Sequence, residues 1–344
     1  MREKKRDTRI DILRFLAIIG IIVAHTHPPD WLFELRNFDV TLIVMMMGAS
    51  FFISNQSKDK VEYVAYATKR FKRLIVPTWV FLTIFFTLFL VLSFVQNDSY
   101  YFDLNKVVNS YATLGGIGYV WIMRVFFIIA LASPILLSIS NKTQKTFAYF
   151  AWIIGAYVIY SMCILINNFL PNGLISSLYE EVFLYGFGYV LVAAIGIRLL
   201  VMKNKELLYL GVTSLLIYGI LAISTDFAST QDFKYTPTMY YLSYGIFIGV
   251  CLYLLVSIPV VNKWLSNKFF MFISINSLWL YLWHIIPVYI LKVYDKVSIF
   301  KSTFLLEFCF VFGIGLLLTL IHNKLSIIIK KDKSNKQLVV RTSA

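Results

Sequence analysis

The chain has 344 residues, of which 59% are hydrophobic, 17% aromatic and only 15% charged. Soluble globular proteins contain about 45–50% apolar and about 25% charged residues. A mean hydropathy of +0.74 therefore excludes a water-soluble protein with one core. The formal net charge of +14 would suggest a nucleic-acid partner in a soluble protein. Here the basic residues separate apolar runs, which is typical of membrane proteins, so we expect an all-α, polytopic membrane protein that binds no nucleic acid.

Apolar runs of about 17–25 residues are long enough to span a bilayer as helices. The first follows a basic head, as in a secretory signal peptide, but no small-residue cleavage site comes after it, so we interpret it as a span. We predict one transmembrane domain over 1–329 and a basic, disordered cytoplasmic tail over 330–344. The ten predicted spans lie near 10–27, 39–55, 74–95, 118–139, 147–166, 176–197, 207–224, 237–257, 270–291 and 300–321.

The sidedness of these spans follows from their basic residues. One set of loops and both ends of the chain together carry 24 Lys and Arg residues, whereas the opposite loops carry 6. Because cytoplasmic loops are enriched in Lys and Arg, this split predicts that both termini are cytoplasmic. The expected location is a cytoplasmic membrane, with membrane lipids around a multi-pass bundle.

The first span carries three ionisable residues, Asp11, Arg14 and His25. A charge within a span costs at least about 2.5–3.5 kcal/mol, so such residues are candidates for a functional site. At about 100° per residue they share one helix face, with His25 about 16 Å beyond Arg14. On this face, Arg14 would bind an anion at one end and His25 would transfer a proton at the other. The alternative is that Arg14 reaches the headgroups and His25 caps the helix at the outer interface.

A basic loop, with the sequence KRFKR at 69–73, precedes the third span and Pro77. Arg70 and Arg73 are three residues apart, so they can face the same way on a helical turn. Their planar guanidinium groups suit bidentate contacts with phosphate. The alternative is an ordinary basic loop end that binds anionic lipid.

Arg124 lies inside the fourth predicted span, where it requires a partner. Glu180, Glu181 and Glu307 are suitable partners. The sequence allows two roles for Arg124, in a structural ion pair or in a site that binds an acceptor sugar. The neighbouring Trp121 can stack on a sugar or mark the membrane interface.

Two further polar residues, Asp39 and His284, complete the candidates. Asp39, at the mouth of the second span, can polarise an acceptor hydroxyl or cap the helix. His284, inside the ninth span, can share a cavity with His25 or form a structural hydrogen bond. Cys163, Cys251 and Cys309 stand singly, and the chain contains no metal-ligand cluster and no Walker or dinucleotide motif, so no metal is expected.

The spacing of Arg14 and His25, the Arg70-x-x-Arg73 pair before Pro77, and ten spans together resemble the bacterial membrane-bound acyltransferase-3 family. Weaker resemblances extend along essentially the whole chain, in FDVTLIVMMMGASFF, GYVWIMRVFFIIALASPIL and SLWLYLWHIIPVYIL. The VMMMGAS stretch departs from the phenylalanine- and serine-containing stretch of relatives, so the family does not predict what lines a pore here.

The resemblance implies transfer of an acyl group, mostly acetyl, from cytoplasmic acyl-CoA to a surface glycan. By resemblance, His25 is the catalytic histidine and Arg14 its partner. Arg70 and Arg73, with Lys69 and Lys72, would bind acyl-CoA. The glycan would be an exopolysaccharide, a capsule or a lipid-linked precursor, with other polysaccharide-biosynthesis membrane proteins as further partners. Neutral imidazole suits the removal of a hydroxyl proton near pH 7, and whether His25 acts as a base or carries the acyl group stays open.

Two rival functions remain at this stage. The intramembrane charges could line the path of a polysaccharide export component without acyl-transfer chemistry. They could also pair with one another in a structural membrane protein, which would pack Arg14 and His25 without a shared cavity. The enzyme hypothesis predicts instead one continuous polar cleft from Arg70 and Arg73 to His25.

Overall fold

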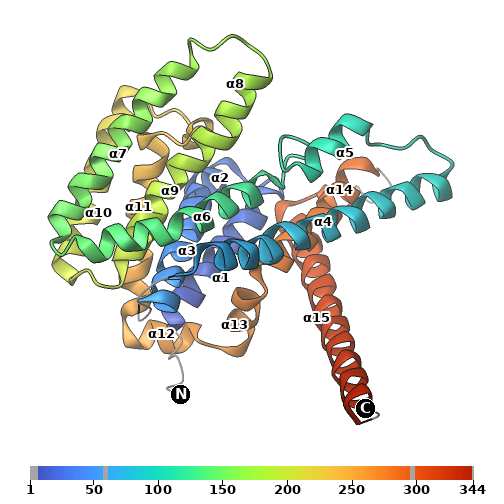
Figure 1. The fold of residues 1–344 in the computed structure, drawn as a ribbon. Coiled ribbons are helices and arrows are strands. Elements are labelled where there is room, and N and C mark those ends of the chain that lie inside the picture. Colours follow the sequence, from blue (N-terminus) through green and yellow to red (C-terminus); the bar gives the residue numbers. More distant parts are fainter. Residues whose placement is uncertain (1–6, 57–60, 295–298, 343–344) are drawn as a thin grey trace.

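The computed structural model describes residues 7–56, 61–294 and 299–342, with side chains described as far as Ile329. Over these ranges the regular structure is entirely helical (Figure 1), which confirms the all-α prediction. A helix stands at each predicted span: α1 (Thr8–Ala24), α3 (Asp39–Asn55), α4 (Tyr63–Gln96), α6 (Trp121–Lys142), α7 (Thr146–Asn167), α9 (Tyr185–Leu199), α10 (Asn204–Ser224), α11 (Met239–Ser257), α14 (Ser277–Val293) and α15 (Phe304–Thr342).

Shorter helical pieces join these long helices, and the sequence did not predict them. They are α2 (Asp30–Leu35), η1 (Arg36–Phe38), α5 (Leu104–Tyr111), α8 (Leu174–Leu178), η2 (Tyr179–Leu184), η3 (Thr230–Phe233), α12 (Pro259–Leu265) and α13 (Lys268–Ile275). Each is too short to cross a bilayer, so hydropathy carries little signal for it.

Eight helices in the described part of the chain are long and apolar enough to cross a membrane. The bent pair α13 and α14 makes a ninth if it counts as one span, while α1, with 17 residues, is not among them. The count of ten therefore stays a prediction, as do the cytoplasmic termini. The basic residues at 1–6 and 57–60 and the side chains of the tail at 330–344 lie outside the description, so the predicted disorder of that tail is also untested.

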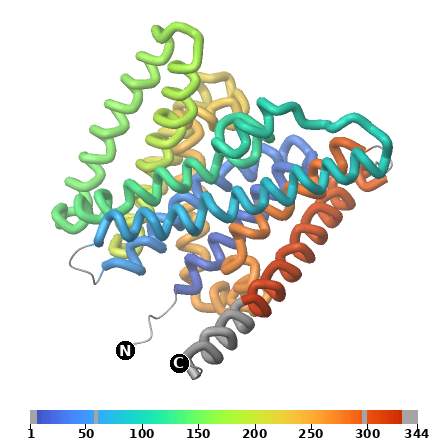
Figure 2. The backbone as a smooth tube through the Cα atoms, turned by 45° about the vertical axis from the view of Figure 1, so that its right-hand side comes forward, coloured from blue at the N-terminus to red at the C-terminus, as the bar shows by residue number. Residues whose placement is uncertain are grey.

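Inner and outer helices differ in how much of their surface the bundle covers. Within the most apolar stretch of each segment, the buried share is 72% in α2–α3 and 78% in α8–α9. The corresponding share is 17% in α7 and 22% in α10. The long helix α4 crosses the bundle in both views, and α15 runs down one flank (Figures 1 and 2). The exposed apolar faces of α7, α10 and α15 suit contact with lipid.

Two glycines bring the central helices α3 and α9 into close contact. A Cβ atom added at Gly48 would collide with the carbonyl oxygen of Ala193, and one added at Gly196 would collide with that of Met45. Small residues at such crossings let helix backbones approach in a membrane, where packing rather than water exclusion drives association. The α3–α9 pair forms the centre against which α1, α6 and α11 pack.

Two elements differ from the predicted spans in a way that shapes the site. The predicted span 270–291 is broken at Asn276, where α13 and α14 meet at an 82° bend. The Asn276 side chain bonds the Phe272 carbonyl at 2.8 Å and accepts from Asn323 of α15 at 2.8 Å. Residues 69–73, predicted as a loop, lie within α4, because Lys and Arg are good helix formers and the helix continues beyond its apolar stretch.

Candidate active site

A cavity of about 350 Å³, here called the inner cavity, lies among α1, α3, α4, α6 and α14. Of the two cavities described here, it is the one nearer the start of α1. The hydroxyl of Thr8, the first residue of α1, donates to Asn262 of α12 at 2.9 Å. Its polar lining comprises Arg14, Ser50, Ser54, Tyr66, Arg70, Arg73, Ser133, Ser277 and Tyr281. Three guanidinium groups in one cavity make it suited to anions.

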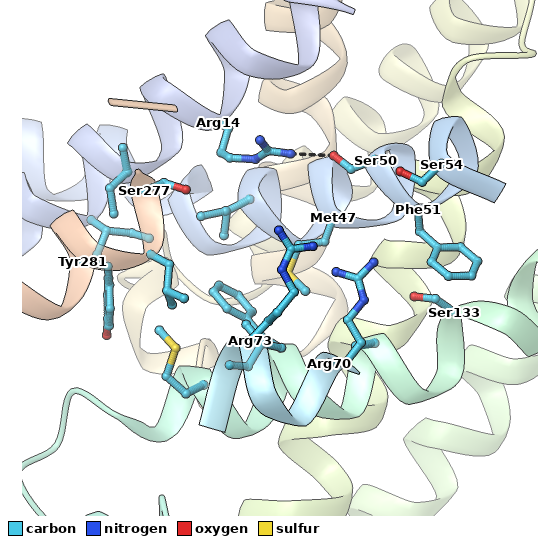
Figure 3. A pocket seen from close by; sticks show the side chains of 18 of the residues that line it. Arg14, Met47, Ser50, Phe51, Ser54, Arg70, Arg73, Ser133, Ser277 and Tyr281 are labelled. Atoms are coloured by element: carbon cyan, nitrogen blue, oxygen red, sulfur yellow. Dashed lines mark hydrogen bonds between the residues drawn. The ribbon is translucent and has the colours of Figure 1, made fainter. Parts of the chain in front are cut away.

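Arg14 is held in place at this cavity by two neighbours. One terminal nitrogen, Nη2, donates to Ser50 Oγ at 2.6 Å (Figure 3). The other, Nη1, donates to Asp11 Oδ1 at 3.4 Å. Asp11, which is buried, also accepts from Ser274 Oγ at 3.0 Å. Asp11 and Arg14 therefore lie on one face of α1, as predicted, and Asp11 fixes the orientation of Arg14.

The basic segment of α4 divides between two environments. Arg70 and Arg73 extend side by side from α4 towards α3 (Figure 3) and line the inner cavity. Arg70 also stacks over the Tyr66 ring, with Cζ 4.9 Å from its centroid. Lys69 and Lys72 are exposed and do not line the cavity, because positions one residue away turn by about 100° around the helix. Within the described ranges, no carboxylate is ion-paired with Arg70 or Arg73.

A second cavity of about 350 Å³, here called the outer cavity, lies beyond the end of α1. His25, the residue that caps α1, lines it together with Asp39, Tyr119, Trp121, Lys234, Tyr235 and Lys292. The structure therefore brings together three predicted residues, His25, Asp39 and Trp121, from α1, α3 and α6.

His25 forms a hydrogen-bonded pair with His284, which is fully buried in α14. The two rings lie nearly parallel, and His25 Nδ1 is 2.8 Å from His284 Nε2. His284 Nδ1 also bonds the carbonyl of Tyr281, and a carbonyl can only accept, so this nitrogen carries a proton. In neutral His284, Nε2 is then the acceptor and His25 donates from Nδ1. The hydrogen-bond network thus assigns the lone pair of His25 to Nε2.

The surroundings of the histidine pair fix its position. The His25 ring packs edge-on against Tyr119, with centroids 4.7 Å apart. Tyr281 donates its hydroxyl to the Tyr119 carbonyl at 2.5 Å, which ties α14 to the segment before α6. On the other side Gly315 of α15 approaches His284, whose Cα would lie 3.2 Å from an added Cβ.

The two cavities meet rather than merge. Ile21 and Tyr281 line both of them and so lie where the two cavities adjoin. The predicted continuous cleft is therefore two adjoining cavities in this structure, and Ile18 and Ile21, on α1 between Arg14 and His25, line the inner one. Arg14 and His25 are also not packed against each other, as a purely structural role would require, since each lines a cavity.

A buried ionic group borders the outer cavity, and two of its members were not predicted. Asp39 lies between Arg36, whose Nη1 is 3.2 Å from Oδ2, and Lys234, whose Nζ is 3.3 Å from Oδ1. All three residues are at most 5% exposed. Burial lowers the pKa of Lys234, and the Asp39 carboxylate opposes this shift. The only signal in the sequence was that Arg36 and Lys234 are basic residues in loops where few basic residues occur.

Arg124 forms an ion pair with Glu181, with Nη1 3.2 Å from Oε2, and donates to the Thr113 carbonyl at 2.5 Å. Glu181 sits in η2, a π-helical turn, which changes the direction of the side chains that follow α8. Neither residue lines either cavity. Glu307, the other suggested partner, instead bonds His27 at 2.9 Å.

Residues 7–324 match the family model described as an acyltransferase domain. The chain belongs to the acyltransferase-3 family. No curated protein and no solved structure matches the chain. As a member of this family with eight or more helices suited to cross a membrane, the protein is a multi-pass membrane acyltransferase.

Proposed function

We propose that the protein transfers an acyl group, most simply acetyl, from acyl-CoA bound at the inner cavity to a glycan hydroxyl in the outer cavity. The observation that carries this proposal is the juxtaposition of the two cavities, which share Ile21 and Tyr281 in their linings. One holds paired guanidinium groups that suit phosphates, and the other holds an imidazole with an assigned lone pair.

In the proposed reaction, Arg70 and Arg73 bind the phosphates of coenzyme A, and Arg14 binds the donor nearer the outer cavity. The thioester passes Ile21 and Tyr281 to reach His25. His25 Nε2 accepts the proton of the acceptor hydroxyl as its oxygen bonds to the thioester carbon. The C–S bond then breaks, and the thiolate takes the proton as free coenzyme A. His284 fixes the tautomer of His25 and so acts as a positioning residue.

The same lone pair could instead attack the thioester and carry the acyl group. Intact-protein mass spectrometry separates the two routes: with acetyl-CoA and no acceptor, the general-base route predicts no acetyl group on the protein. An acetyl group found on His25 would assign the covalent route.

The proposal is tested with purified protein in detergent, acetyl-CoA and glycan extracted from the producing cells. We expect the wild-type protein to release free thiol and acetylate the glycan, and His25→Ala to lower both rates about 10²–10⁴-fold. His322, also a histidine but outside both cavities, supplies the matched control His322→Ala, which keeps the activity. Normal acetylation by His25→Ala would refute the assignment. Absence of thiol release by the wild-type protein, with glycan still reaching the cell exterior, would favour the export function.

A further inference from the structure

The outer cavity carries an excess of positive charge. Arg36 and Lys234 share the single carboxylate of Asp39, so this buried group has a formal charge of +1. Lys292, which is exposed, adds a second cation at the cavity wall. Glu34, which lies nearby, accepts from Ser229 at 2.6 Å and Asn37 at 3.3 Å instead. A buried charge without full compensation is costly, and an anion in the cavity would lower that cost.

Lys234 is held rigidly at the cavity wall. Its backbone carbonyl accepts from the hydroxyl of Tyr189 at 3.0 Å, and its ammonium group is anchored by Asp39. The segment before it is fastened to the α2–η1 segment, where Asn37 donates to Thr230 at 2.9 Å and Arg36 to Gln231 at 3.3 Å. An ammonium group placed in this way loses little conformational freedom when it binds an anion, which increases affinity.

Aromatic rings form the rest of the polar wall. Trp121 packs edge-on against Tyr235, with centroids 5.4 Å apart, and Tyr119 packs against His25. Tyr235 is 44% exposed, so part of this surface is free to receive a ligand. Rings of this kind present flat apolar faces that pack against a sugar ring, whereas a lipid headgroup offers no comparable face.

We infer that the acceptor is an anionic sugar, one that bears a carboxylate or a phosphate. The anionic group lies against Lys234, the ring packs on Trp121 and Tyr235, and a hydroxyl is presented to His25. This inference rests on the proposed function, because it names the chemical class of the acceptor that the same site uses.

Direct binding to the full-length protein in nanodiscs of neutral lipid, without acyl-CoA, tests the inference. The probes are methyl glucuronide, which supplies a carboxylate, glucose 6-phosphate, which supplies a phosphate, and methyl glucoside, which is neutral. Tryptophan fluorescence or calorimetry reports the affinities. We expect at least one anionic sugar to bind about tenfold or more tightly than methyl glucoside, and its affinity alone to fall as salt is raised. Equal affinity for all three sugars would overturn the inference.

Substitutions then assign the preference to the cavity. Lys234→Gln should abolish the preference for the anionic sugar, and Lys234→Arg should keep it. Lys301→Gln makes the same charge change at an exposed residue outside the cavity and should leave the preference intact. If Lys234→Gln does not fold, Lys292→Gln at the cavity wall should still weaken the preference. A preference that survives both Gln substitutions would overturn the inference.

The lipid phosphate is the competing ligand. If anionic phospholipid in the nanodiscs displaces the anionic sugars, the cavity binds headgroups and the inference is wrong. Failure of the inference is also distinct from failure of the proposed function. A protein that releases thiol from acetyl-CoA but binds all three sugars equally overturns only the inference. One that selects anionic sugars but never releases thiol supports the inference and overturns the acyl-transfer proposal.

Discussion

The hydrogen bond between His25 and His284 is the contact through which the fold would control the base. His284→Asn removes this bond, whereas His284→Gln keeps an acceptor for it. Asn places its amide near the δ position of the imidazole, where it can still donate to the Tyr281 carbonyl, but it leaves no acceptor for His25. Gln places its amide near the ε position, where its oxygen can accept from His25 Nδ1. Both variants therefore carry a neutral amide, and each imitates one ring nitrogen of His284: Asn the donor to Tyr281, and Gln the acceptor from His25.

The size of the effect follows from the energy of this bond. The net contribution of one hydrogen bond is about 0.5–1.5 kcal/mol. Without it, the other tautomer of His25 competes with the active one, which lowers kcat by up to about tenfold. Loss of orientation adds to this, and the upper limit is the contribution of the base itself, about 10²–10⁴-fold. We therefore predict that His284→Asn lowers kcat about 10- to 100-fold, while the KM for acetyl-CoA stays unchanged because the inner cavity is intact.

The assay is thiol release from acetyl-CoA by purified protein with its glycan acceptor, alongside the thermal unfolding midpoint of each variant. We expect His284→Gln to keep most of the activity, with a midpoint close to that of His284→Asn. Full kcat in His284→Asn would refute the positioning role. Equal losses in both variants, with equal loss of stability, would indicate that His284 serves only the packing of α14 against α15.

Two further predictions concern the proposed donor site and the packing of the bundle. Arg73→Ala should raise the KM for acetyl-CoA about tenfold or more with little change in kcat, because a charged hydrogen bond to phosphate contributes about 1.5–3 kcal/mol, whereas Lys72→Ala, on the exposed face of α4, should leave KM unchanged. An equal effect of both substitutions would show that α4 attracts the donor only by general charge. Gly196→Ala should lower the free energy of unfolding by at least about 1–3 kcal/mol, since the added Cβ meets the Met45 carbonyl. Gly219→Ala, where an added Cβ has nothing within 4 Å, should be neutral or stabilising. An unchanged unfolding midpoint for Gly196→Ala would contradict the close α3–α9 contact.

The long helices could be predicted because hydropathy measures the free energy of transfer into lipid, and each run is long enough to give a clear signal. The same measure is insensitive to the direction of a helix axis, so the break at Asn276 within one apolar run went unpredicted. It also treats charges as the end of a helix, which placed residues 69–73 in a loop although they belong to α4.

The candidate site shows the same division. The shared face of Arg14 and His25 follows from helical geometry within seventeen residues of α1 and its cap, and the sequence alone could supply it. The partner of His25 stands 259 positions away, and the Lys234 partner of Asp39 stands 195 positions away. Nothing local in the sequence distinguishes these partners from other polar residues near a membrane.

Composition and spacing therefore determined that this chain is a membrane-spanning helical protein with an arginine and a histidine on one helix face. Only the packing of α1 against α14 decided that the histidine is paired and that its lone pair lies on Nε2. Packing also decided that two cavities adjoin at Ile21 and Tyr281. The reason is that transfer into lipid is a sum over local residues, whereas a hydrogen bond depends on bringing distant residues to within about 3 Å, which the tertiary fold alone achieves.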